Sequence, residues 1–320
     1  MANKPDFFDV AIIGAGVAGL YASYCAGISG LNSCIIDSLM CPGGQCSVLY
    51  PDKKVYGVPG FEDATAGEFI EKLSNQALSL TAKTFFGQKV EFIAKLPSEV
   101  FQIKSRGFDI LSRHLIIASG IGDMKPSVPN SIIGLSDIKE GSDFVQYYCM
   151  RIDLYKDKDV IIAGGGDSAV DFAINIAPIS KSVTLIHRRD NLICEAIKLS
   201  TLEKLQSSGK LKIELGTQIE AIKESRNNRI VKTNKEEIKV DHVVFCYGFS
   251  SNAGGVGGLA ELGICFNNNT IDVDINTMET SVENCFAIGD VANYINKKKN
   301  IVPCFFEADR AIRTIKKKIS

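Results

Sequence analysis

The stretch VAIIGAGVAG at residues 10–19 sets three spaced glycines, Gly14, Gly16 and Gly19, directly after an apolar run. The run predicts a buried strand, and the residues after the glycines predict a helix. Glycines at this spacing permit a tight turn, the close approach of a pyrophosphate to the backbone, and close packing of helix on strand. The next apolar run ends in Asp37, 23 positions after Gly14, where a carboxylate hydrogen-bonds a free ribose 2′-hydroxyl. This unit predicts a dinucleotide site, which we assign to FAD.

A second unit of the same kind, VIIAGGGDSA, occupies residues 160–169. Its next apolar run ends in His187, which lies 23 positions after Gly164 and so takes the place that Asp37 has in the first unit. Arg188 and Arg189 follow, and a cationic cluster at this place accommodates a 2′-phosphate, which guanidinium groups can bind in a bidentate manner. We therefore predict an NADPH site made by Gly164, Gly166, Asp167, Ser168, Ala169, His187, Arg188 and Arg189.

Together the two units predict an α/β fold with two Rossmann-like (three-layer ββα) nucleotide-binding domains, one inserted in the other. Apolar runs that close on small residues, LIIASG at 115–120 and VVFCYGF at 243–249, are typical of a backbone that crosses between domains. We expect an FAD-binding domain made of residues 1–120 plus 249–320, and an NADPH-binding domain made of residues 121–248.

Composition excludes several classes of protein. With 320 residues, 45% apolar residues and a net charge of −1, the chain is typical of a globular protein and not of a nucleic-acid binder. Its apolar stretches are shorter than the roughly 20 residues that span a bilayer, and its first residues lack the apolar core of a signal peptide. Most of its ten cysteines stand singly in apolar runs, as free thiols do. We expect a cytoplasmic protein with no nucleic-acid partner, no membrane partner and no metal site.

Five motifs make the chain similar to one family over nearly its whole length. They are VAIIGAG at 10–16, PGGQ at 42–45 with LYP at 49–51, GGGDSAVD at 164–171, HRRD at 187–190 and AIGD at 287–290. Together they resemble the thioredoxin-reductase-like ferredoxin–NADP reductases. In addition to the first glycine turn, the resemblance implies FAD contacts at Asp37, Gln45, Tyr50, Val90, Met124, Gly289 and Asp290.

The resemblance also implies a function, electron transfer through FAD between NADPH and ferredoxin or flavodoxin, and a homodimer. We nominate no catalytic side chain, because the cofactor does the redox chemistry while the protein supplies binding and orientation. Three alternatives stay open at this stage. The protein could reduce free flavins or quinones as a diaphorase, or reduce a disulfide with Cys41 and Cys46. It could be a nucleotide-binding redox sensor. Thioredoxin reduction is disfavoured, because the chain has no Cys-x-x-Cys pair.

The C-terminal stretch gathers many cations. These are Lys297, Lys298, Lys299, Arg310, Arg313, Lys316, Lys317 and Lys318. One interpretation is the solvated face of an amphipathic closing helix. The other is a landing patch for an acidic electron carrier, since complementary charge raises the rate of encounter.

Overall fold

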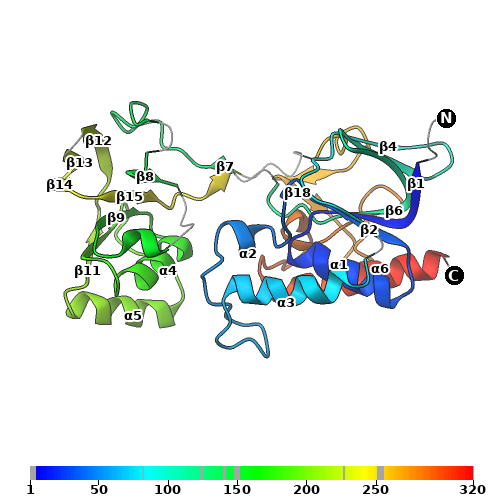
Figure 1. Ribbon diagram of the computed structural model, residues 1–320, viewed down its shortest axis with the longest axis horizontal. Coiled ribbons are helices and arrows are strands. Elements are labelled where there is room, and N and C mark those ends of the chain that lie inside the picture. The colour runs from blue at the N-terminus through cyan, green and yellow to red at the C-terminus, as the bar shows by residue number, and fades with distance from the viewer. Residues whose placement is uncertain are drawn as a thin grey trace. The chain divides into compact units, whose positions relative to one another are not determined.

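The chain forms two compact units, which the computed structural model describes over residues 5–81, 83–122, 125–139, 142–147, 152–225, 228–250 and 256–319. Unit 1 consists of Met1–Met124 and Ser251–Ser320, and unit 2 consists of Lys125–Ser250 (Figure 1). At the boundary, β7 (Lys125–Pro126) pairs antiparallel with β16 (Phe249–Ser250). The chain therefore enters and leaves unit 2 along paired strands.

Unit 1 is built on a seven-stranded sheet. Six strands follow the order β3-β2-β1-β6-β5-β4, and the seventh, β19, pairs with β6. Strands β1, β2, β3, β6 and β19 pair in parallel, whereas β4, β5 and β6 form an antiparallel meander. The strands are β1 (Asp6–Ile13), β2 (Ser33–Ile36), β3 (Lys83–Phe85), β4 (Phe92–Lys95), β5 (Phe101–Ser105), β6 (Phe108–Ile117) and β19 (Cys285–Ala287).

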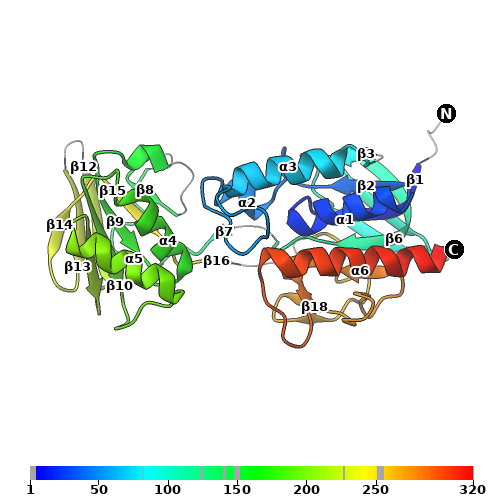
Figure 2. The same ribbon diagram turned by 90° about the horizontal axis from the view of Figure 1, so that it is seen from below.

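Helices α1 (Val17–Ile28), α3 (Ala66–Leu78) and α6 (Ile301–Ile319) lie side by side against this sheet (Figure 2). The shorter elements are α2 (Gln45–Val48), η3 (Gly289–Val291) and the strands β17 (Phe266–Asn267), β18 (Thr270–Asp272) and β20 (Ala292–Asn293). A capping box starts α3, because Thr65 Oγ1 accepts from Glu68 N at 3.2 Å and the Glu68 carboxylate accepts from Thr65 N at 2.8 Å.

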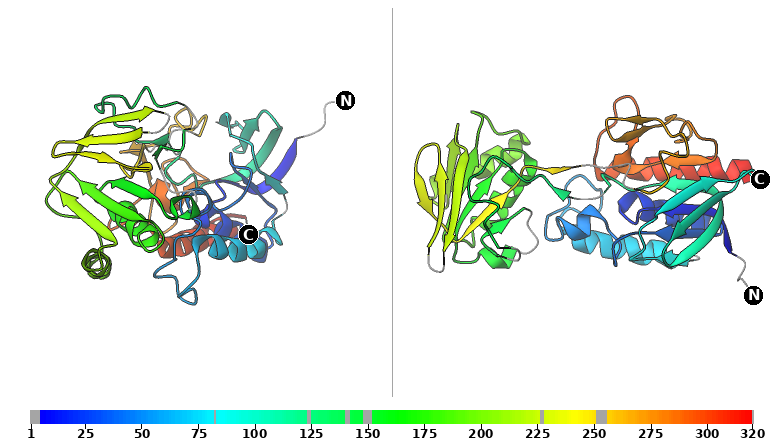
Figure 3. Two further views of the ribbon diagram at one scale, coloured as in Figure 1. Left: turned by 60° about the vertical axis from the view of Figure 1, so that its left-hand side comes forward. Right: turned by 90° about the horizontal axis from the view of Figure 1, so that it is seen from above.

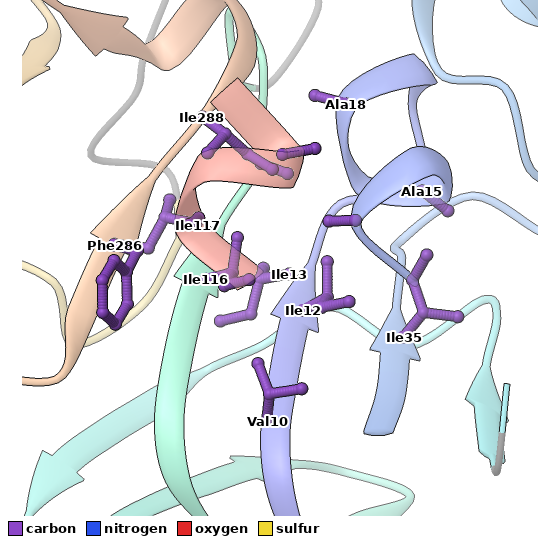
Figure 4. Packing of buried hydrophobic residues seen from close by; sticks show 14 of the residues in the cluster. Val10, Ile12, Ile13, Ala15, Ala18, Ile35, Ile116, Ile117, Phe286 and Ile288 are labelled. Carbon is purple, nitrogen blue, oxygen red and sulfur yellow. The ribbon is translucent and has the colours of Figure 1, made fainter. Parts of the chain in front are cut away.

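The core of unit 1 explains why β1 ends in an unbroken apolar run, Val10–Ile13. Val10 and Ile12 are fully buried in the sheet beside Ile35 and Ile116, with Phe286 of β19 close by (Figure 4). A parallel strand that is covered on both faces requires apolar side chains at every position rather than at alternate ones.

Unit 2 repeats the plan with a five-stranded sheet of order β11-β10-β9-β15-β8. Its apolar clusters lie on both faces: one packs under α4 and α5, and the other packs under a separate antiparallel sheet, β12-β13-β14 (Figure 3). The elements are β8 (Val145–Gln146), η1 (Ile152–Tyr155), β9 (Asp159–Ala163), α4 (Asp167–Ile176), β10 (Ser182–His187), α5 (Ala196–Ser207), β11 (Leu211–Leu215), β12 (Ile219–Ser225), β13 (Asn228–Thr233), β14 (Glu237–Lys239) and β15 (His242–Phe245). This is the ββα layering that the two sequence units predict.

Candidate nucleotide-binding sites

The first glycine turn joins β1 to α1, and each of its glycines has a different environment. Gly14 has φ +106°, and a Cβ there would lie 2.3 Å from the carbonyl oxygen of Ala118. A Cβ at Gly19 would lie 1.8 Å from the carbonyl oxygen of Gly14. Gly16, the N-cap of α1, faces open space, with nothing within 4 Å of an added Cβ and no side chain capping the helix. The open cradle at Gly16, with first-turn N–H groups behind it, fits a pyrophosphate.

Asp37 follows β2 and lies against the first glycine turn. Its Oδ2 accepts a hydrogen bond from Ala15 N at 2.6 Å, and its Oδ1 accepts one from Leu39 N at 2.8 Å. Burial raises the pKa of the carboxyl, although these backbone hydrogen bonds oppose the shift. Gln88 N donates to the Asp37 carbonyl at 2.9 Å, so the segment that leads to the buried Val90 runs beside Asp37. The hydrogen bond from Gln88 thus ties Asp37 to the segment that carries Val90.

A second group of predicted FAD residues meets at the same turn. Gln45 Nε2 donates to Asp290 Oδ2 at 3.2 Å across 245 positions of sequence. The loop before Gln45 is tied to the glycine turn, because Gly43 N donates to the Ala15 carbonyl at 2.7 Å. Tyr50 lies just after α2, with Lys53 Nζ 5.4 Å from the centre of its ring. Met124, also predicted to contact FAD, lies outside the described residues.

The second glycine turn joins β9 to α4 in unit 2. Gly164 has φ +155°, and a Cβ there would lie 2.7 Å from the carbonyl oxygen of Cys246 and 3.1 Å from the Cβ of the fully buried Ala169. Gly166 is the N-cap of α4 and, like Gly16, faces open space. The exposed Ser168 lies in the first turn of α4. At Gly166 this turn therefore has the same open cradle that the first turn has at Gly16, and it too fits a pyrophosphate.

The end of β10 presents the residues that distinguish the two sites. The ring of His187 packs on Gly165, where an added Cβ would lie 2.3 Å from Cγ of the ring. Burial lowers the pKa of His187, and Arg189 and Arg188 lower it further, which favours the neutral imidazole. Both arginine side chains are exposed, and neither has an ion pair with any other described residue. Two accessible guanidinium groups at this place fit a 2′-phosphate.

Lys198 on α5 is a site residue that the sequence analysis missed. Its Nζ lies 2.8 Å from Asp167 Oδ1, 3.0 Å from Asp171 Oδ1 and 3.6 Å from Glu195 Oε2. Burial alone would lower the pKa of Lys198, but the hydrogen bonds to Asp167 and Asp171 outweigh it and the pKa is raised. Lys198 therefore neutralises an acid that stands at the first position of α4. No local pattern marks Lys198, because packing of α5 on α4 creates the contact.

Replacing Lys198 with methionine should raise the Michaelis constant for NADPH by about fivefold, since an unpaired Asp167 would repel a pyrophosphate at the N-terminus of α4. The measurement is steady-state kinetics at low ionic strength. Lys204→Met, which removes an exposed cation from the same helix, is the control and should leave the constant unchanged. Equal effects of the two substitutions would contradict this role of Lys198.

The two cysteines of the disulfide-reductase alternative differ in environment. Cys41 is exposed, whereas Cys46 lies in α2, and both are free thiols. Burial, and then the charge of Asp290, raise the pKa of Cys46 to about 11. A thiol with such a pKa is protonated at neutral pH, unlike the thiolates of redox-active cysteine pairs.

Five of the C-terminal cations lie on α6, the three lysines at 297–299 precede that helix, and not all eight side chains reach solvent. The buried face of this helix consists of Cys304, Glu307, Ala308, Ala311, Ile312 and Ile315. The Lys297 side chain is only 4% exposed and is ion-paired with Glu307, so Lys297 belongs neither to a solvated face nor to a landing patch. Arg313 pairs with Asp309, and Lys318 pairs with Glu279. The geometry favours an amphipathic closing helix.

Two kinds of feature are absent from the described part of the chain. None of its helices combines the length and apolar character needed to cross a membrane. Within the same residues, no three His, Cys, Asp or Glu side chains gather as they would around a metal ion.

Comparison with known proteins places the chain in a family. The model of the pyridine nucleotide-disulphide oxidoreductases matches residues 8–311, which include both glycine turns and the Gly289–Asp290 turn. The chain belongs to the pyridine nucleotide-disulphide oxidoreductase family. One relative in this family, the ferredoxin–NADP reductase of Anaplasma phagocytophilum (strain HZ), is 35% identical over 317 residues, or 97% of this chain and 92% of the relative. The ferredoxin–NADP reductase of Ehrlichia canis (strain Jake) is 34% identical over 315 residues, or 96% of this chain and 91% of the relative. These relatives confirm the resemblance that the five motifs indicated.

Solved structures of the family confirm the predicted fold class. The crystal structure of T. acidophilum thioredoxin reductase superimposes with a TM-score of 0.82, covering 98% of this chain and 99% of that chain at 24% identity. At this identity the likeness is one of fold. It confirms a thioredoxin-reductase-like architecture of two dinucleotide-binding domains.

Proposed function

We propose that this protein is an FAD-dependent ferredoxin–NADP reductase, which moves electrons between NADPH and ferredoxin or flavodoxin. The contrast between its two glycine turns carries the proposal: a carboxylate, Asp37, lies against the first turn, and exposed arginines directly follow the equivalent position in the second unit. This contrast suits one dinucleotide with a free 2′-hydroxyl and one with a 2′-phosphate. Two relatives of nearly the same length bear the name ferredoxin–NADP reductase.

In unit 1 separate groups of residues would bind the pyrophosphate, the adenosine and the ribityl chain of FAD. The pyrophosphate would bind at Gly14, Gly16 and Gly19, with the adenosine ribose at Asp37 and the adenine near Val90. Asp290, oriented by Gln45 Nε2 at 3.2 Å, would accept from the ribityl hydroxyls, and Tyr50 would lie close by. When bound, FAD supplies the exchange between hydride transfer and single-electron transfer.

In unit 2 the chain's own residues bind and orient NADPH. Arg188 and Arg189 would bind the 2′-phosphate, and the Gly164–Ala169 turn would receive the pyrophosphate. The neutral ring of His187 would hold the backbone of the turn at Gly165. Lys198 would keep Asp167 from repelling the phosphates. These roles are binding and positioning, so no side chain need act as acid, base or nucleophile.

The test is NADPH oxidation by the FAD-loaded protein, coupled to cytochrome c, with and without a bacterial ferredoxin. We expect strong dependence on ferredoxin. Fast oxidation without that dependence would instead indicate a diaphorase that reduces free flavins or quinones. Negligible turnover with every acceptor would indicate a redox sensor.

Replacing both Cys41 and Cys46 with serine should leave ferredoxin-dependent turnover within about twofold of wild type, because a thiol with a pKa of about 11 is a poor nucleophile at neutral pH. The measurement is the same coupled assay, with bound FAD quantified by its absorbance. Loss of turnover with FAD still bound would revive the disulfide-reductase alternative.

Two further expectations stay predictions. A homodimer is expected from the family resemblance, and sedimentation equilibrium of the FAD-loaded protein measures it. The cytoplasmic location is expected from the composition, and fractionation of the source cells measures it.

A further inference from the structure

A fully buried carboxylate lies beneath the Gly289–Asp290 turn of unit 1. Glu307, on α6, is 0% exposed. Its Oε2 accepts a hydrogen bond from Gly289 N at 2.6 Å. Its Oε1 accepts from the Tyr294 hydroxyl at 2.7 Å and is ion-paired with Lys297 Nζ. One side chain on α6 therefore ties down both the start and the end of the segment 289–297.

Burial of the Glu307 carboxylate costs free energy, because a charge is removed from water. A buried charge is tolerated only when it is paired and hydrogen-bonded, and here three donors converge on one carboxylate. Burial, and then the hydrogen bond to Glu307, raise the pKa of Tyr294, so its hydroxyl stays protonated and donates. An apolar side chain could fill the same volume without the desolvation cost. Packing alone therefore does not account for a glutamate at this position.

The turn that Glu307 holds is wedged between two helices. Gly289 has φ +75°, and a Cβ there would lie 2.9 Å from the Cβ of Ala18 in the first turn of α1. The next residue, Asp290, accepts from Gln45 Nε2 at 3.2 Å. The hydrogen bond that Gly289 N donates to Glu307 on α6 thus fixes the backbone immediately before Asp290, and α1 limits its movement from the other side.

We propose that Glu307, with Lys297 as its counter-ion and Tyr294 as a second donor, is a positioning residue that preorganises the Gly289–Asp290 turn to receive the ribityl chain of FAD. It acts through Gly289 and Asp290. A turn that already has its bound conformation needs no ordering when the ligand binds, and this strengthens affinity. The inference rests on the proposed FAD site and deepens it, because it assigns the affinity of that site in part to an ion pair on α6.

The test is the dissociation constant of FAD, measured by titrating FAD fluorescence with the flavin-free protein. Glu307→Gln should weaken binding by roughly tenfold or more, because the amide has a single acceptor oxygen for donors on two sides. Lys297→Met should weaken it as well. In the double variant the dissociation constant should rise by less than the product of the two single fold-changes, because the double variant leaves no unpaired charge. Glu71→Gln, which changes an exposed glutamate of α3 in the same unit, is the matched control and should bind FAD as wild type does.

Two further measurements distinguish the positioning role of Glu307 from a merely structural one. Thermal unfolding of the flavin-free variants reports stability, and visible circular dichroism at saturating FAD reports how the flavin is held. An altered dichroism band and weaker binding in folded Glu307→Gln support the proposal. A lower melting temperature with an unchanged dissociation constant and unchanged dichroism overturns it. Should Glu307→Gln fail to fold, Tyr294→Phe removes only one hydroxyl and should still weaken FAD binding by roughly threefold, and wild-type affinity in that variant overturns the proposal.

Failure of the proposed function gives a different result. A wild-type protein that binds no FAD overturns the proposed function and this inference together. Wild-type binding of FAD with unaltered binding by the ion-pair variants overturns only the positioning role.

Discussion

The Michaelis constant for NADPH should rise by about tenfold for each guanidinium removed when Arg188 and Arg189 are replaced by glutamine, whereas that for NADH should change little. Tenfold is the lower end for a charge-assisted hydrogen bond, and we choose it because both side chains are exposed and solvent weakens such contacts. The selectivity for NADPH follows because only NADPH carries the 2′-phosphate. The measurement is steady-state kinetics of the single and double variants with each coenzyme at fixed, low ionic strength.

A matched control lies at the other end of the same strand. Lys181 immediately precedes β10, at its amino end, and pairs with Asp159 at 2.7 Å on the exposed surface. Lys181→Gln removes a cation from unit 2 without touching the carboxyl end of the sheet, and it should leave both constants unchanged. If the arginine variants lost NADH and NADPH to the same degree, the assignment of the 2′-phosphate to this cluster would be refuted.

The largest effect on FAD is expected from one methyl group at Gly16. Gly16→Ala should weaken FAD binding by at least about tenfold, because the added Cβ would stand in the open cradle that a pyrophosphate needs. The flavin-free protein should keep its stability to within about 0.5 kcal/mol, since nothing lies within 4 Å of that Cβ and the backbone there is extended. FAD titration and thermal unfolding of the flavin-free variant measure the two quantities.

The same substitution at Gly19 should instead act on the stability of the flavin-free protein. A Cβ at Gly19 would lie 1.8 Å from the carbonyl oxygen of Gly14, so Gly19→Ala should destabilise the flavin-free protein by about 3 kcal/mol or more. The main effect of Gly19→Ala would therefore be lower stability of the flavin-free protein, and any loss of FAD affinity would follow from that. Wild-type FAD binding by Gly16→Ala would show that the pyrophosphate does not lie at this turn.

Much of this site could be predicted from local sequence. Glycine spacing after an apolar run predicted both turns. The acid at the end of the next run in the first unit, and the arginines just after the equivalent position in the second, predicted which nucleotide each turn would prefer. These signals are local because they depend on backbone sterics and on the register of one strand with the next. The predicted fold class is confirmed, and the individual contacts to FAD and NADPH stay predictions.

Other features could not be predicted because they depend on which elements pack together. The pairing of Gln45 with Asp290 spans 245 positions, and the contact of Lys198 with Asp167 requires α5 to lie on α4. The sequence analysis counted Lys297 among surface cations, because a lysine in a basic run is normally solvated. Its partner, Glu307, is one of the few acids in the stretch and lies ten positions away.

The sequence by itself thus determined the two-unit α/β plan, the two glycine turns and the contrast between Asp37 and the Arg188–Arg189 pair. Only the tertiary structure decided which charges are buried, which are paired and which remain exposed. The physical reason is that backbone sterics act over a few neighbouring residues, whereas the cost of burying a charge depends on everything that folds around it. Lys297 and Arg188 look alike in the sequence, but one lies in an ion pair beneath the candidate FAD turn and the other is exposed beside the second glycine turn.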